Sequence, residues 1–318
     1  MRQNILRTAV AVAAAVVVGF VSSPAGATPN ATASIRAHFD WAKGQTPENA
    51  ATEPDGSLDV TFSLARQVAK VEADGTTHIL ATMPLPADGG VSTPVLRFAA
   101  TMGIVRDADG TLYFLYAAGA ADLTGVWRLR PHGTPERIAA LPADALPNGL
   151  ALDRRHGMLY IADSALGTIW AVHTTGGQAT AWSTAPELAF SSIAGANGLK
   201  IHNNALWVAN TDKGTIVRIP FLPGRRPGPV QTRATGLTTV DDFAFTGGGD
   251  EILAALHRVN QVVRIRPDGS HSTVLTAADG LRNPTAIEVR RGTVYVLDAA
   301  YATAEDPNLL TVRLRDLR

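Results

Sequence analysis

Four oxygen-bearing side chains recur at the same place in a pattern that repeats along this chain. Each stands at the start of an apolar segment: Glu48, Asn148, Asn197 and Asp241. Two carboxylates and two amide oxygens, completed by water, match the roughly six to eight hard oxygen ligands that calcium prefers. Zinc favours histidine and cysteine, and the chain has 0 Cys. If the repeat brings the four side chains together, they predict a site for Ca²⁺ or another divalent cation.

A second set of polar side chains ends the apolar segment that follows in each repeat. Its members are Ser63, Tyr116, Asp163, Asn210, His257 and Asp298. When two segments pair as antiparallel strands, the start of the first lies beside the end of the second. We therefore expect both sets to line one central mouth, where carboxylates would repel one another without a cation. The expected contacts to a small-molecule substrate come from Tyr116, Asp163, Asn210 and Asp298.

Each of these residues also has an ordinary structural explanation. An Asn-Gly pair before a strand is usually a turn with a positive φ angle, and that explanation suits Asn148 or Asn197 taken alone. An Asp or Asn at a strand end often caps the next turn. The functional interpretation depends on the residues occupying equivalent positions in several repeats.

The repeat itself predicts the fold. An apolar strand, a polar turn and a second apolar strand recur six times, and the starts of successive copies lie 49, 44 and 44 positions apart at Asn148, Asn197, Asp241 and Thr285. Four short strands with their hairpins need about that length. No window shows sustained helical periodicity, and the 29 Gly and 19 Pro supply turns. The pattern predicts an all-β, six-bladed β-propeller with four-stranded antiparallel blades around a central axis.

The first 27 residues predict that the protein is exported. A basic start is followed by about 14 apolar residues and an Ala-x-Ala ending at Ala27, which is typical of a secretory signal peptide and too short for a membrane span. We expect cleavage there, with residues 28–318 exported as one propeller domain.

Charge and cysteine content bear on partners and stability. The chain carries 28 Lys+Arg and 28 Asp+Glu, which gives no reason to expect nucleic acid or a membrane surface as partner. With no Cys, the exported domain depends on its core rather than on disulfides. Nothing in the sequence indicates an obligate interface, so we expect a monomer.

Several motifs resemble the SMP-30/gluconolactonase family, which includes regucalcin-like and diisopropylfluorophosphatase-like proteins. The resemblance lies in Pro147–Asp153, Leu159–Ser164, Ala196–Leu199, Asp241–Phe245 and Val262–Gly269, and it covers about Pro47 to Arg315. It implies a six-bladed propeller with an axial divalent cation held by a Glu, two Asn and an Asp. By position these are Glu48, Asn148, Asn197 and Asp241, the same four residues.

The resemblance also implies a catalytic role for Asp241, as general base or nucleophile. Near a cation that polarises a carbonyl, Asp241 would activate water or attack directly, and His257 would assist proton transfer. We therefore expect a secreted, calcium-dependent hydrolase of a lactone or related ester. The adjacent acids leave open whether Asp241 or Asp242 faces the axis. Two other classes stay open: a non-catalytic binding module, and a strictosidine-synthase-like or lyase-like enzyme of secondary metabolism.

Two further expectations concern the frame. The segment Ala33–Phe39 is placed to pair beside Leu309–Leu314 and close the ring of blades. Selectivity is expected from loops over the mouth, which are Ala117–Thr124, Ser183–Ala194 and Ala299–Pro307.

Overall fold

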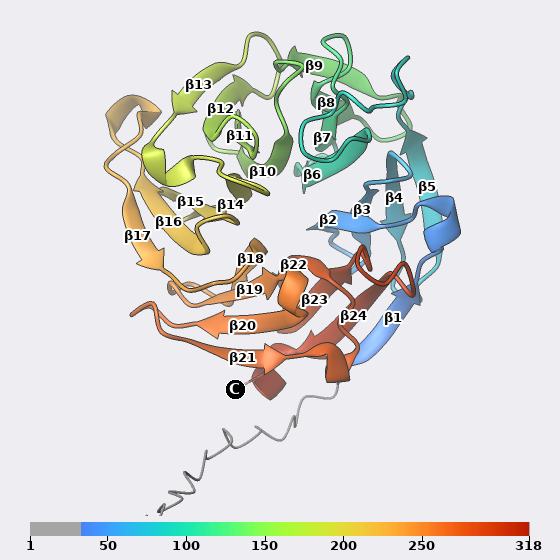
Figure 1. Cartoon of the computed structure of the whole chain (residues 1–318), viewed down its shortest axis with the longest axis vertical. Helices are drawn as coiled ribbons and strands as arrows, with labels where there is room; N and C mark the ends of the chain where they lie inside the picture. Colours follow the sequence, from blue (N-terminus) through green and yellow to red (C-terminus); the bar gives the residue numbers. More distant parts are fainter. Residues whose placement is uncertain (1–32, 318) are drawn as a thin grey trace, which may run out of the picture.

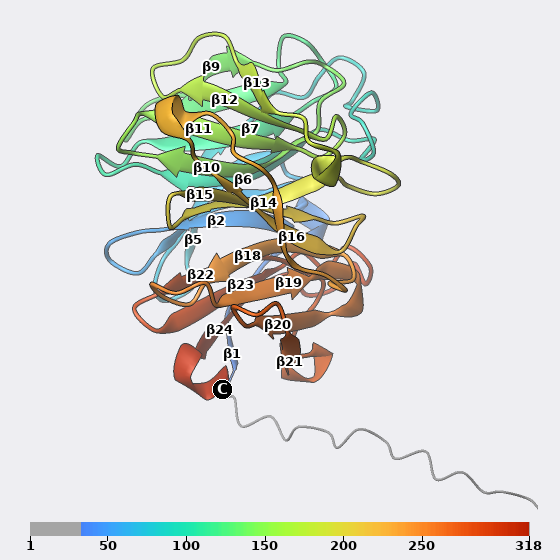
Figure 2. The ribbon, with the colours of Figure 1, turned by 90° about the vertical axis from the view of Figure 1, so that its left-hand side faces the viewer.

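Six four-stranded antiparallel sheets surround a central axis in the computed structural model, which describes residues 33–317 (Figure 1). The predicted all-β, six-bladed propeller is confirmed. Seen edge-on, the innermost strands run across the thickness of the disc (Figure 2). The predicted signal peptide, residues 1–27, lies outside the described residues. No helix among residues 33–317 has the length and hydrophobicity needed to span a membrane.

Blades 1 to 5 each use four consecutive strands, numbered from the axis outward, and blade 6 combines three consecutive strands with β1. Blade 1 contains β2 (Pro47–Thr52), β3 (Leu58–Phe62), β4 (Gln67–Val71) and β5 (Thr77–Thr82). Blade 2 contains β6 (Ala100–Arg106), β7 (Leu112–Ala117), β8 (Gly125–Leu129) and β9 (Glu136–Ala140). Blade 3 contains β10 (Pro147–Asp153), β11 (Met158–Asp163), β12 (Thr168–His173) and β13 (Thr180–Ser183).

The second half of the chain repeats this order. Blade 4 contains β14 (Ala196–His202), β15 (Ala205–Asn210), β16 (Thr215–Pro220) and β17 (Gln231–Ala234). Blade 5 contains β18 (Val240–Phe245), β19 (Ile252–Leu256), β20 (Gln261–Ile265) and β21 (His271–Leu275). Blade 6 contains β22 (Pro284–Arg290), β23 (Thr293–Asp298), β24 (Asn308–Arg313) and, on its outer edge, β1 (Ser34–His38).

Short 3₁₀ helices lie in the connections. They are η1 (Trp41–Lys43), η2 (Pro186–Leu188), η3 (Pro223–Arg225), η4 (His257–Val259), η5 (Ala277–Asp279) and η6 (Leu314–Leu317). Two of them, η1 and η4, contribute residues to the cavity described below.

The hydrophobic core is divided among the interfaces between neighbouring blades. Each of six buried apolar clusters combines side chains from two adjacent blades, because both faces of every twisted sheet are covered by its neighbours. The cluster between blades 1 and 2, for example, contains Val68 and Phe114, and both side chains are fully buried. Loss of one blade interface would therefore expose apolar surface on two blades.

The ring closes through the N-terminal strand, as predicted. Strand β1 pairs antiparallel with β24, with Ser34 opposite Thr311 and His38 opposite Asn308. The two strands lie side by side at the edge of the disc in Figure 1. Ala37 and Phe39 are buried against blade 1, and the rings of Phe39 and Phe62 are 4.9 Å apart. The closure thus contributes to the core as well as covering an edge.

Candidate functional site

A bulge near the start of each innermost strand positions the candidate cation ligands. In blade 3 the pairing with β11 jumps from Pro147 to Leu150, and in blade 4 the pairing with β15 jumps from Ala196 to Leu199. In blade 1 it jumps from Pro47 to Asn49, which leaves Glu48 without a partner. A bulge breaks the alternation of side chains and redirects the residue it contains. The same irregularity occurs in blades 2, 5 and 6, so one local geometry is repeated around the axis.

The glycines after the candidate ligands allow the innermost strands to approach one another. A Cβ atom on Gly149 would lie 2.1 Å from the carbonyl oxygen of Asn197, and one on Gly198 would lie 2.6 Å from that of Asp241. Both glycines lie within strands and neither has a positive φ angle. The explanation of the Asn-Gly pairs as turns is therefore wrong, because the missing side chain makes room for the next blade.

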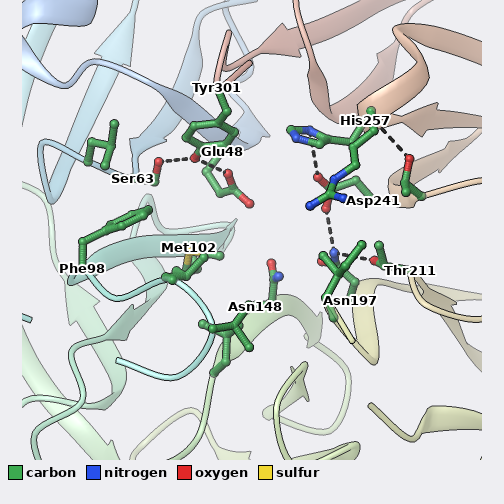
Figure 3. A pocket seen from close by; sticks show the side chains of 18 of the residues that line it. Glu48, Ser63, Phe98, Met102, Asn148, Asn197, Thr211, Asp241, His257 and Tyr301 are labelled. Atoms are coloured by element: carbon green, nitrogen blue, oxygen red, sulfur yellow. Dashed lines mark hydrogen bonds and ion pairs between the residues drawn. The ribbon is translucent and has the colours of Figure 1, made fainter. Parts of the chain in front are cut away.

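The four candidate ligands converge on one space on the axis. Figure 3 shows Glu48, Asn148, Asn197 and Asp241 projecting toward it from different blades. All four line a cavity of about 420 Å³. The Asn197 amide donates to Asp241 Oδ1 at 2.8 Å and to Thr211 Oγ1 at 2.9 Å, which occupies its NH₂ group and leaves its oxygen available as a ligand.

The two carboxyl groups in this space are buried near other acids, so their ionisation is unfavourable. Burial raises the pKa of Glu48 to about 7, and the nearby Asp242 carboxylate adds to the rise. Burial also raises the pKa of Asp241 well above its usual range, with Glu48 and Asp242 contributing in turn. Both shifts show the cost of placing negative charge here without a counterion. A bound cation of charge two would remove that cost.

The donor set fits a hard cation rather than a zinc-like ion. Two carboxylates and two amide oxygens suit calcium, which completes its coordination with water. Among residues 33–317 there is no group of three or more His, Cys, Asp or Glu side chains suited to a metal ion. The candidate site therefore depends on the two asparagines, and Glu48, Asn148, Asn197 and Asp241 are the residues that would hold the cation.

Tyr301 holds Glu48 in place, and the sequence analysis did not single it out. Its hydroxyl donates to Glu48 Oε2 at 2.8 Å and is also hydrogen-bonded to Ser63. Burial, followed by the Glu48 charge, raises the pKa of Tyr301 well above its usual value, so the phenol stays protonated as a donor. The available signal was its place in the expected mouth loop Ala299–Pro307.

His257 begins η4 beside Asp241 and is neutral at physiological pH. Burial, followed by the Arg258 charge, lowers the pKa of His257 to about 4. Its Nδ1 atom lies 3.7 Å from Asp241 Oδ2, beyond hydrogen-bond distance, and is buried with no hydrogen-bond partner among the described residues. An uncharged imidazole with a free nitrogen can accept or relay a proton next to Asp241.

The adjacent acids Asp241 and Asp242 have separate partners. Asp241 faces the cavity, whereas Asp242 accepts hydrogen bonds from Lys200 Nζ at 2.9 Å and from Asn49 Nδ2 at 3.2 Å. Lys200 also donates to Glu288 Oε1 at 3.1 Å. These contacts form a second polar layer on the axis, and they leave Asp241 as the acid that faces the mouth.

None of the four residues expected to contact a substrate lines the cavity, so the expectation that they lie at the mouth is corrected. These residues are Tyr116, Asp163, Asn210 and Asp298. Their side chains turn toward neighbouring connections. Tyr116 donates to Pro84 O at 2.6 Å, and Asp298 accepts from the Arg282 backbone at 2.7 Å.

The remaining two cap loops in the same way. Asp163 accepts from the backbone of Leu146 at 3.0 Å and Leu166 at 3.1 Å. Asn210 donates to the carbonyl oxygen of Glu187 at 3.0 Å. Of the second-strand ends, only Ser63 and His257 line the cavity. A strand end can cap its own turn or face the axis, and the sequence pattern does not distinguish the two orientations.

The cavity is bounded mainly by segments outside the strands. Of the three expected mouth loops, Ser183–Ala194 contributes Ile193 and Ala194, Ala299–Pro307 contributes Tyr301, and Ala117–Thr124 contributes none. The connection between β5 and β6, residues 83–99, contributes Val95, Leu96 and Phe98 and was not anticipated. Trp41 and Arg258 also line the cavity.

Comparison with known proteins supports the fold assignment and does not assign a function. No family model matches the chain, and no curated protein matches it in sequence. A solved gluconolactonase from Xanthomonas campestris superposes with a TM-score of 0.65 at 15% identity, covering 89% of this chain and 89% of that one. A virginiamycin B lyase from Staphylococcus aureus superposes with a TM-score of 0.60 at 16% identity, covering 86% and 82%.

A third similar structure carries yet another activity. The PQQ-bound aldose sugar dehydrogenase from Streptomyces coelicolor gives a TM-score of 0.60 at 13% identity, covering 90% of this chain and 99% of that one. A lactonase, a lyase and a dehydrogenase therefore resemble this chain at similar levels. All three resemble this chain in fold, and the function of this chain has to be argued from its own site.

Proposed function

We propose that this protein is a divalent-cation-dependent hydrolase acting on a lactone or related ester, with Ca²⁺ as the preferred ion. The observation that carries the proposal is the convergence of Glu48, Asn148, Asn197 and Asp241 on the floor of one cavity. A bound cation would polarise the substrate carbonyl and stabilise the negative charge that develops on its oxygen.

Asp241 is the proposed general base. Once ionised, its carboxylate takes a proton from a water molecule as the water oxygen bonds to the acyl carbon. The acyl carbon–oxygen bond of the lactone or ester then breaks, and the departing oxygen receives that proton, which yields a hydroxy acid or an acid and an alcohol. The neutral His257 imidazole lies beside Asp241 and is the proposed relay for this proton.

Cation binding is the first test. Calcium is titrated by calorimetry into the wild-type protein, Glu48→Gln and Asp241→Asn, followed by a screen of lactones and esters. Tight binding by wild type that both substitutions weaken, together with hydrolysis that a chelator abolishes, would support the proposal. Hydrolysis that persists without any cation would refute the proposed dependence. No cation binding and no hydrolysis would favour the non-catalytic binding module.

We also propose that residues 1–27 direct export and that the released chain acts as a monomer on a small molecule. Mass spectrometry of protein collected from the medium of an expressing culture should give a chain that begins at Thr28. Light scattering of that protein should give a mass close to one chain. A retained leader or a stable dimer would overturn the corresponding part of this proposal.

A further inference from the structure

We infer that the substrate carries a hydrocarbon group next to its lactone or ester carbonyl and is not a polyhydroxylated sugar lactone. This inference rests on the proposed function for the identity of the reacting group. It is carried by the walls of the cavity, whose chemistry differs from that of its floor. The lining includes six large apolar side chains, here together called the apolar wall: Trp41, Leu64, Leu96, Phe98, Met102 and Leu146.

The apolar wall combines elements from separate parts of the chain. Trp41 comes from η1, Met102 from the start of β6, and Leu96 and Phe98 from the connection between β5 and β6. In Figure 3, Phe98 and Met102 lie on the side of the cavity opposite Asp241 and His257. Leu96 and Phe98 are only partly buried, so a ligand could remove further apolar surface from water.

The connection between β5 and β6 presents an apolar side chain to this cavity in a restricted conformation. Val95, which also lines the cavity, is 41% exposed and has a φ angle of +59°. A positive φ is rare for a β-branched residue and persists only where surrounding contacts enforce it. Here Arg97 N bonds to Thr93 O at 3.0 Å, and Thr93 is fully buried. The surrounding contacts thus hold a partly exposed valine in the lining of the cavity.

Hydroxyl groups in the lining are already engaged, which argues against a sugar. Thr211 Oγ1 donates to Val240 O at 2.8 Å and accepts from Asn197. Ser63 Oγ is hydrogen-bonded to Thr46 and Tyr301. A polyol buried here would leave several of its hydroxyls without partners, at a cost for each.

Two further polar side chains of the lining, His257 and Arg258, come from η4 beside Asp241 and not from the apolar wall. Thr239 Oγ1 accepts from the Arg258 backbone at 3.1 Å, and the Arg258 side chain is exposed. The cavity volume of about 420 Å³ suits a small molecule. A polar floor under an apolar wall therefore fits a carbonyl compound with an alkyl or aryl substituent.

Chain-length dependence tests the inference independently of catalysis. Binding of γ-butyrolactone, γ-decanolactone and glucono-δ-lactone is measured on chelator-treated protein, and hydrolysis of the same three compounds is measured with calcium. Each methylene that the wall covers should increase affinity about fourfold. We expect γ-decanolactone to bind at least tenfold more tightly than γ-butyrolactone, and glucono-δ-lactone to bind most weakly.

Matched variants locate the effect. Phe98→Ala and Leu96→Ala should reduce the preference for γ-decanolactone, whereas Val91→Ala should not, because Val91 is 51% exposed in the same connection and does not line the cavity. A melting curve for each variant checks that it is folded. Equal binding of the two γ-lactones, or tighter binding of glucono-δ-lactone, would overturn the inference whether or not hydrolysis occurs. A chain-length preference without hydrolysis would uphold the apolar wall and remove the proposed activity.

Discussion

Replacing Glu48 by Gln should stabilise the cation-free protein while it weakens cation binding. Glu48 is 8% exposed, and its pKa is raised from 4.5 to about 7. Above pH 7 the ionised carboxylate therefore lowers the free energy of unfolding by about 3 kcal/mol relative to an unperturbed glutamate. Gln keeps an oxygen that can accept the Tyr301 hydrogen bond and carries no charge.

The expected effect has a defined pH dependence. Between pH 4.5 and 7 the folded state binds more protons at Glu48 than the unfolded state does, so wild-type stability should fall as the pH rises through this window. Glu48→Gln lacks this contribution, and its advantage should grow from near zero at pH 4 to its full value at pH 8. For a domain of this size, about 3 kcal/mol corresponds to a melting temperature roughly 5 °C higher.

The assay is thermal unfolding in chelator at pH 4, 6 and 8, repeated with calcium. The control is Glu305→Gln, since Glu305 is exposed in the connection that contains Tyr301. With calcium the order should reverse at pH 8, because the ion stabilises the form that binds it more tightly. A variant that is less stable than wild type in chelator at pH 8 would show that Glu48 stabilises the cation-free fold. The buried Glu48 charge would then not destabilise the protein as we expect.

Three further predictions concern closure, blade packing and ligand positioning. Deleting residues 28–40 should lower the melting temperature of the whole disc, because it removes β1 and two buried side chains; an unchanged melting temperature would contradict the closure. Gly149→Ala should lower the free energy of unfolding by about 1–3 kcal/mol in urea titrations, whereas Gly248→Ala, which has open space around it, should change it little. Tyr301→Phe should weaken calcium binding about 10- to 100-fold by calorimetry through loss of the Glu48 hydrogen bond, and unchanged affinity would exclude this positioning role.

The fold was predictable because it depends on periodic features. Strand length, turn residues and a spacing of 44 to 49 positions fix the number of blades, and each blade buries the face of the next. The pairing of β1 with β24 was also predictable, since a propeller must cover its last edge. Such properties survive errors of a residue or two at any strand boundary.

Side-chain direction at strand ends was harder to predict. The cavity-facing residues Glu48, Asn148, Asn197 and Asp241 all come from the bulged starts of the innermost strands, where one geometry is repeated. Asp163 has a comparable place at the end of a second strand, yet its carboxylate accepts from backbone amides of its own loop. A polar side chain at a strand end can either cap its own loop or point toward the axis, and the conformation of the loop decides which of the two occurs. The apolar wall shows the same limit, because a 17-residue irregular connection supplies it.

Asp242 occupies a position at which three other blades have a glycine. Blades 2, 3 and 4 place Gly103, Gly149 and Gly198 at the position that Asp242 holds in blade 5, and each of those glycines contacts the next blade too closely for a side chain. Asp242 instead turns to Lys200 and Asn49 on the axis. Burial alone would lower the pKa of Lys200, but the Asp242 and Glu288 charges raise it on balance, so the lysine stays charged. This fixed positive charge pairs with both Asp242 and Glu288 and balances one of their two negative charges, whereas Glu48 and Asp241 have no lysine or arginine partner among the described residues. Their combined charge equals that of one divalent cation, and this balance is the physical reason to expect the ion at the mouth rather than deeper on the axis.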